Sequence, residues 1–73
     1  MTPIQIEGII ATLRNENPDT RIIADIMHNT VKVTVSSPNY PTRTPEWPLE
    51  STSVESFEAT LRSLLQLYPG LHK

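Results

Sequence analysis

The residues of this chain best suited to chemistry are two histidines, because an imidazole can take up and release a proton near neutral pH. His28 falls at a predicted turn and His72 near the C-terminal end. Neither histidine has a carboxylate at a spacing that would orient its ring as a general base. Asp25 is explained better as the partner of Lys32 across a predicted hairpin than as a general base. We therefore predict that the chain is not an enzyme.

The composition also argues against bound cofactors and metals. The chain has 73 residues and no cysteine, which excludes a disulfide and a thiolate zinc site. Its only glycines are Gly8 and Gly70, so there is no glycine-rich loop to hold a phosphate. The serines and threonines fall at predicted helix caps and strand faces, where local hydrogen bonds explain them. We predict no catalytic residue, no cofactor and no metal.

The distribution of charge bears on partners and location. Six Lys and Arg residues stand against eight Asp and Glu residues, which gives a net charge of −2 spread singly along the chain. A nucleic-acid binder needs clustered positive charge to neutralise phosphates, so we predict no nucleic-acid partner. The apolar runs are too short for a membrane span, and Met1-Thr2-Pro3 lacks the layout of a signal peptide. The expected location is cytoplasmic, with no membrane partner.

The segment from Asn39 to Pro48 contains three of the seven prolines, the only Trp and one of the two Tyr residues. Proline fixes φ and lacks a backbone N–H, which predicts a stiff, extended connector over residues 37–48. Residues 47–50 can add a short third strand, which Pro48 would confine to a sheet edge. Tyr40 and Trp47 are either core residues or interface anchors, and the sequence leaves both alternatives open.

Two amphipathic helices are predicted on either side of this connector. The first covers about residues 3–15, with Thr2 as its cap and Pro3 in its first turn. The second covers about residues 53–68, with a capping box from Thr52 to Glu55 and a stop at Pro69-Gly70. The apolar stripes are Ile6, Ile9, Ile10 and Leu13 in the first helix, and Val54, Phe57, Leu61, Leu64, Leu65 and Tyr68 in the second. Gly8 is either a point of close backbone approach or a tolerated weak point in its helix.

Residues 21–36 predict a β-hairpin that turns at His28-Asn29. In that register Ile22 faces Val35, Ala24 faces Val33 and Ile26 faces Val31, so that one face of the hairpin is wholly apolar. The other face carries the Asp25–Lys32 pair. A slip by one residue would mix the two faces, so this register is strongly preferred.

These elements predict one domain over residues 1–73, of the α+β class. The expected order is α-β-β-(β)-α, where the bracketed strand is the short one near Trp47. Two amphipathic helices and a sheet that is apolar on one side suit a two-layer sandwich, with both helices on one face of a small antiparallel sheet.

Two families share this order of elements. The double-stranded-RNA-binding domain needs lysines at the start of its second helix, where this chain has Ser51-Thr52-Ser53-Val54-Glu55. The segment Tyr40-Pro41-Thr42-Arg43-Thr44-Pro45 resembles the Tyr-Pro-x-x-x-Pro motif of RWD domains, which are similar to the core of ubiquitin-conjugating enzymes. This resemblance implies a non-catalytic protein-interaction module in which Tyr40 packs beneath the connector. The chain is expected to have one strand fewer than that family and lacks its further helix, and without cysteine it has no conjugating activity.

We therefore predict a small protein-interaction module that acts through the sheet face opposite the helices or through the edge beside the connector. One alternative is a stand-alone regulator or inhibitor, of the kind found in mobile elements, that occludes a larger partner. Another is an assembly subunit that forms a homodimer through the same face. The candidate partner-binding residues are Tyr40, Arg43, Trp47, Ile23 and Met27.

Overall fold

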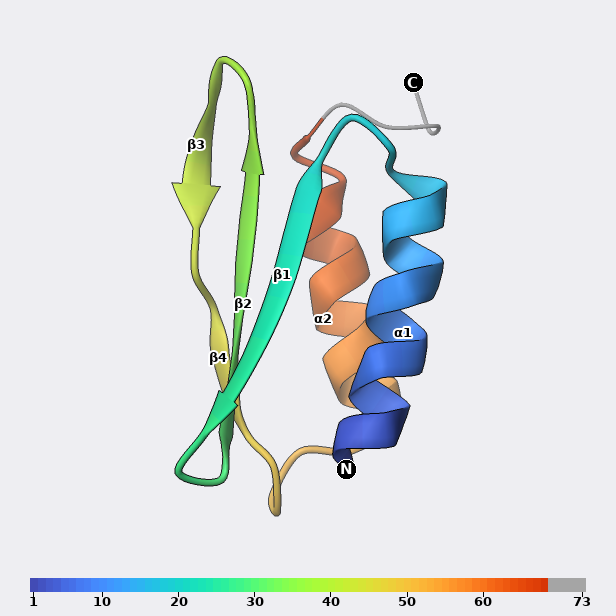
Figure 1. The fold of residues 1–73 in the computed structure, drawn as a ribbon, viewed down its shortest axis with the longest axis vertical. Coiled ribbons are helices and arrows are strands. Elements are labelled where there is room, and N and C mark those ends of the chain that lie inside the picture. The colour runs from blue at the N-terminus through green and yellow to red at the C-terminus, as the bar shows by residue number, and fades with distance from the viewer. Residues whose placement is uncertain (69–73) are drawn as a thin grey trace.

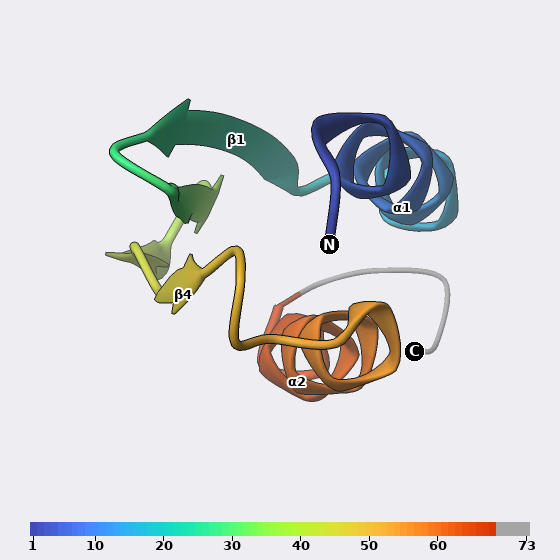
Figure 2. The same ribbon diagram turned by 90° about the horizontal axis from the view of Figure 1, so that it is seen from below.

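The computed structural model describes residues 1–68, which form two helices and one four-stranded antiparallel sheet (Figure 1). The elements are α1 (Pro3–Glu16), β1 (Arg21–Met27), β2 (Thr30–Ser37), β3 (Tyr40–Arg43), β4 (Glu46–Pro48) and α2 (Val54–Leu65). Figure 2 shows both helices on one side of the sheet, with α1 beside β1 and α2 across from β4. The predicted α+β class and the placement of both helices on one face are confirmed.

Helix α1 begins and ends as its sequence predicts. The Thr2 side chain accepts a hydrogen bond from the Gln5 amide, and the Gln5 side chain accepts one from the Thr2 amide, which completes a capping box. At the other end the backbone amide and the side-chain amide of Asn17 both donate to the Leu13 carbonyl, at 2.9 and 2.8 Å, and close the last turn. The buried stripe of α1 consists of Ile6, Ile10 and Leu13.

The hairpin has the predicted register at every pair, from Arg21 opposite Ser36 to Met27 opposite Thr30. His28 and Asn29 have φ of 52° and 60°, which is the left-handed backbone of a two-residue hairpin turn. The expected burial is wrong at Ile26, whose side chain is 42% exposed although it lies on the helix-facing side. The reason is that β1 is an edge strand, and Figure 1 shows its end near the turn diverging from α1.

The proline-rich connector forms two short strands, where the sequence predicted a stiff linker with at most one. Both β3 and β4 pair with the same side of β2, β3 near Val35 and Ser37 and β4 near Val31. Between them the Pro45 carbonyl accepts a hydrogen bond from the Val33 amide at 3.0 Å. A proline cannot donate to a neighbouring strand, but it can accept, so these prolines are compatible with an interrupted strand at the sheet edge.

Helix α2 begins one residue later than the predicted capping box. Ser53 is the cap, and its hydroxyl accepts a hydrogen bond from the Ser56 amide at 3.1 Å. The buried face of α2 consists of Phe57, Leu61 and Leu65, and Phe57 packs edge-on against Trp47 with ring centroids 4.8 Å apart. The predicted stop at Pro69-Gly70 and the candidate His72 lie outside the described residues.

The helices are also joined by charge. Arg62 of α2 binds Glu16 at the end of α1 at 2.7 Å and Glu58 of its own helix at 2.9 Å. The hydrogen bonds to Glu16 and then to Glu58 raise the pKa of Arg62 above its ordinary value, so its positive charge persists across the physiological range. These side chains are about two-fifths exposed, so the network adds little stability.

Helix α2 ends at Leu65, before the predicted bound at about residue 68, and the Tyr68 hydroxyl ties the turn that follows it to the sheet. The single proton of this buried hydroxyl is shared between two acceptors, the carbonyl of Val35 in β2, at 3.3 Å, and the carbonyl of Pro41 in β3. We expect Tyr68→Phe to lower the free energy of unfolding by about 1 kcal/mol, because both carbonyls lose that donor. Tyr40→Phe is the control, since among residues 1–68 the Tyr40 hydroxyl makes no hydrogen bond. Equal midpoints of urea unfolding for both variants would contradict the prediction.

Candidate functional site

The two edges of the sheet differ in how they are protected against pairing with another chain. The β3–β4 edge carries Pro41, Pro45 and Pro48, and a register shift interrupts its pairing with β2. Prolines and irregular pairing are common protections of an exposed edge. Strand β1 forms the opposite edge with seven residues, no proline and regular pairing throughout. The free side of β1 is therefore the edge that is open to a further strand.

The hydrogen bonds show which backbone groups point out of this edge. Opposite residues in an antiparallel pair either exchange both of their N–H···O bonds or exchange none. The Val33 amide donates to Pro45, so Val33 exchanges no bonds with Ala24 opposite it. The amide and carbonyl of Ala24 consequently point away from β2, and by the alternation of the strand so do those of Ile22 and Ile26.

One of these outward groups is already used by α1. The guanidinium Nε of Arg14 donates to the Ile22 carbonyl at 2.7 Å, which fixes the upper half of α1 against β1. Among residues 1–68, no hydrogen bond is made to the outward amides and carbonyls of Ala24 and Ile26. Two residues of β1 thus offer two donors and two acceptors to a strand laid beside them.

A groove of about 380 Å³ runs beside these free groups, between β1 and α1. Its apolar walls are formed by Pro3, Ile6, Ile10, Ala11, Ala24 and Ile26. The partial exposure of Ile26 is explained by this groove, because no side chain of α1 fills the space over it. Gly8 is not part of the groove, and a methyl group added to it would meet nothing within 4 Å. A close approach at Gly8 is therefore absent within residues 1–68.

The groove carries opposite charges toward its two ends. Arg14 lines it at the level of Ile22, and Glu7 lines it two helical turns away, about 10 Å along the helix axis. Since α1 and β1 run in opposite directions, Glu7 lies toward the Ile26 end (Figure 1). Both ion pairs of the described residues belong to Arg62, so Arg14 and Glu7 have no carboxylate or cationic partner there.

A second, open depression of about 750 Å³ adjoins the Arg14 end of the groove. Arg14 and Arg21 line it together with Asp19 and Ser36. The Ser37 hydroxyl donates to the Asp19 carbonyl at 2.9 Å and holds the loop before β1 against β2. Two guanidinium groups against one carboxylate make this end of the β1 edge positive.

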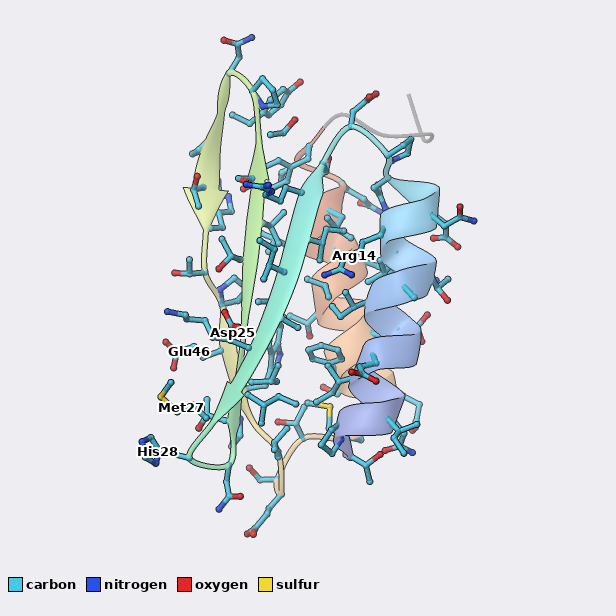
Figure 3. All side chains as sticks on the ribbon, viewed as in Figure 1. Arg14, Asp25, Met27, His28 and Glu46 are labelled. Atoms are coloured by element: carbon cyan, nitrogen blue, oxygen red, sulfur yellow. The ribbon has the colours of Figure 1, made fainter. Side chains whose placement is uncertain are left out.

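The structure separates the candidate residues that the sequence brought together. Ile23 and Met27 lie on the outer sheet face, away from the helices, and Met27 is 66% exposed. Between them lies a charged row in which Asp25, Lys32 and Glu46 are neighbours across three strands. Figure 3 shows Asp25, Met27 and Glu46 projecting from this side. Ile23 and Met27 therefore do not form one continuous apolar patch.

Trp47 is corrected from a candidate interface residue to a core residue. It lies opposite Val31 on the helix-facing side of the sheet, and only 8% of its surface is exposed. Its indole packs edge-on against the ring of Phe57 in α2. Burial against α2 explains this placement, because a large aromatic contributes most to stability when it is covered.

Tyr40 and Arg43 lie on β3, at the edge opposite β1. The ring of Tyr40 is partly exposed and packs on Tyr68, with centroids 5.8 Å apart. Tyr68, and not Tyr40, occupies the buried position beneath Pro41, which corrects what the RWD resemblance implied. The exposed Arg43 lies opposite Val35 in β3, so it is separated by β2 from Ile23 and Met27 of β1.

The residues best suited to chemistry are not assembled into a catalytic arrangement within residues 1–68. His28 projects from the hairpin turn (Figure 3), and it lines a shallow surface of the outer face together with Asp25, Lys32 and Glu46. Asp25 and Lys32 are opposite each other as predicted, yet they form no ion pair within 4.0 Å in the described part of the chain. No three His, Asp or Glu side chains of residues 1–68 are placed to share a metal ion.

Comparisons with known proteins add no relative, since no family model, curated protein or solved structure matches the chain. Neither of the helices in residues 1–68 has the length and apolar character needed to cross a bilayer. The site residues that sequence reasoning missed are Arg14, Glu7, Ala24 and Ile26. The one available signal was the absence of proline from residues 21–27, beside three prolines in residues 41–48.

Proposed function

We propose that this chain is a small non-catalytic protein-interaction module that binds its partner at the free edge of β1. The observation that carries the proposal is that the outward amides and carbonyls of Ala24 and Ile26 make no hydrogen bond within residues 1–68 and lie at the side of an apolar groove. Addition of a strand to an exposed edge is a common mode of peptide recognition, in which main-chain bonds contribute affinity and pockets contribute specificity. The resemblance of Tyr40-Pro41 and Pro45 to RWD domains supports the same class of function.

The alternative of a stand-alone inhibitor uses the same edge, with the occluded segment of its target as the added strand. The homodimer through the outer face has less support, because the Asp25–Lys32–Glu46 row divides Ile23 from Met27. We retain the interaction module as the function that the geometry favours.

Ala24→Pro tests the proposal, because it removes the outward amide and leaves the pairing of β1 with β2 intact. A displayed library of random heptapeptides is selected on the wild-type chain, and the enriched peptides are then measured against the variants. We expect Ala24→Pro to weaken their binding at least about tenfold, since a partner carbonyl loses its donor and meets the proline ring. Ala24→Ser, which keeps the amide but adds a hydroxyl to the groove wall, is the matched control and should lose much less binding than Ala24→Pro.

Thermal unfolding of both variants establishes that each is folded before binding is compared. Enriched peptides that bind Ala24→Pro as tightly as the wild type would show that β1 is not the binding edge. A wild-type selection without any enriched peptide would count against peptide recognition altogether.

A further inference from the structure

We propose that the β1 edge binds an extended peptide antiparallel to β1, with two apolar residues at alternate positions, a cation toward its N-terminal end and a carboxylate toward its C-terminal end. This inference rests on the proposed function and names the chemistry of the partner segment. It follows from the direction of the free backbone groups, the apolar groove and the two unpaired charges.

The backbone groups set the length and direction of the added strand. Every pair in this sheet is antiparallel, and antiparallel pairing is the more stable arrangement per residue. The peptide residues opposite Ala24 and Ile26 would each exchange both N–H···O bonds with β1. At Ile22 only the outward amide is free to bond the peptide, because the Ile22 carbonyl already accepts a hydrogen bond from Arg14. The paired core of the peptide is therefore short.

The groove determines the side chains of the paired residues. Residues directly opposite each other in an antiparallel pair share a face of the sheet, so those opposite Ala24 and Ile26 point toward α1. There they meet Pro3, Ile6, Ile10 and Ala11, which line the groove. The residue between them points to the outer face beside Asp25, where a small polar or basic side chain is favoured. The pattern is thus apolar, polar, apolar.

The charges determine which end of the peptide is which. In the antiparallel orientation the N-terminal part of the peptide lies at Ile26, near Glu7, and the C-terminal part lies at Ile22, near Arg14 and Arg21. A Lys or Arg before the apolar pair would meet Glu7, and an Asp or Glu after it would meet Arg14. Complementary charges of this kind contribute mainly to specificity and register.

A second copy of the chain fits this site less well than a foreign peptide. If β1 of another copy paired here, its helix-facing residues would be Ile22, Ala24 and Ile26, all of them apolar. The paired strand of the second copy would itself bring no charge to Arg14 or Glu7. The unpaired charges therefore favour a partner segment with a charge at each end.

Two blocked synthetic peptides of identical composition test the proposal against the full chain. The matched peptide is Lys-Thr-Ile-Thr-Val-Thr-Glu, and the swapped peptide is Glu-Thr-Ile-Thr-Val-Thr-Lys. We expect the matched peptide to bind about tenfold more tightly at low salt, as two attractions replace two repulsions. The double variant Glu7→Arg with Arg14→Glu, which keeps the net charge, should reverse this preference. Binding is measured by fluorescence polarisation, and thermal unfolding establishes that the double variant is folded.

A nitroxide on the N-terminus of the matched peptide reports its direction. We expect it to broaden the amide signals of Met27 and His28, whereas broadening at Arg21 and Ile22 would mean a parallel strand and would overturn the proposal. Equal affinity for the two peptides, with both lost in Ala24→Pro, would overturn the charge pattern and leave the proposed function standing. Failure of both peptides and of the displayed library would remove the function as well. A wild-type dimer that Ala24→Pro converts to a monomer would assign the edge to a second copy instead.

Discussion

Ile22→Glu is expected to leave the chain unfolded, while the neighbouring Ile23→Glu is expected to remain folded. Ile22 is 1% exposed in the core between the sheet and the helices, and Ile23 is 38% exposed on the outer face. A carboxylate at position 22 would be buried without a charged partner, at a cost that exceeds the few kcal/mol available to a domain of this size. At position 23 the same carboxylate stays in contact with water.

Circular dichroism and thermal unfolding of the two variants check this expectation. A cooperative unfolding transition for Ile22→Glu near that of the wild type would contradict the assigned face of β1. Light scattering of the folded Ile23→Glu variant also tests the homodimer alternative. A change from a wild-type dimer to a monomer would assign the outer face to self-association.

Leu61→Ala is expected to destabilise the domain by about 2–5 kcal/mol, because it leaves a cavity where α2 packs on the sheet. Leu61 is fully buried in the core beside Phe57 and Leu65. A loss of this size is comparable to the whole stability of a small domain without disulfides or metals, so most molecules of the variant would be unfolded at 37 °C.

Leu67→Ala is the matched control for this substitution. It removes the same atoms from a side chain that is 56% exposed, and it should change stability by no more than about 0.5 kcal/mol. Urea unfolding of the two variants gives the comparison. Similar midpoints for Leu61→Ala and Leu67→Ala would show that the stripe of α2 does not face the core as described.

The hairpin was predictable from the sequence because the side chains of a strand alternate with a period of two residues. A slip by one residue would have put Val33 and Val35 on the face opposite Ile22 and Ala24, and the structure has the predicted register, which keeps all four on a single face. The start of α1 was equally predictable, because the Thr2 cap and the Pro3 ring both act within the first turn of the helix. Features determined by neighbours in the sequence were thus open to prediction.

The strands β3 and β4 were harder to predict, because three prolines in residues 40–48 oppose a central strand and resemble a linker. Their pairing with β2 depends on groups far away in the sequence, such as the Val33 amide that donates to Pro45. The burial of Trp47 has the same origin. Its flanking prolines left the direction of its side chain open, and contact with Phe57 decides it.

By itself the sequence determined which faces of the helices and of the hairpin are apolar, where the hairpin turns and where α1 starts. Only the tertiary structure decided which sheet edge stays free and which groups line it. Whether a backbone amide such as that of Ala24 is free depends on every strand and helix that passes beside it. Those elements are distant in the sequence, so a local sequence pattern does not show whether the amide is bonded. The candidate site consists of backbone amides and carbonyls of β1 that no other element bonds, together with a groove that exists because α1 and β1 diverge. For this reason Arg14, Glu7, Ala24 and Ile26 became visible only in the folded chain.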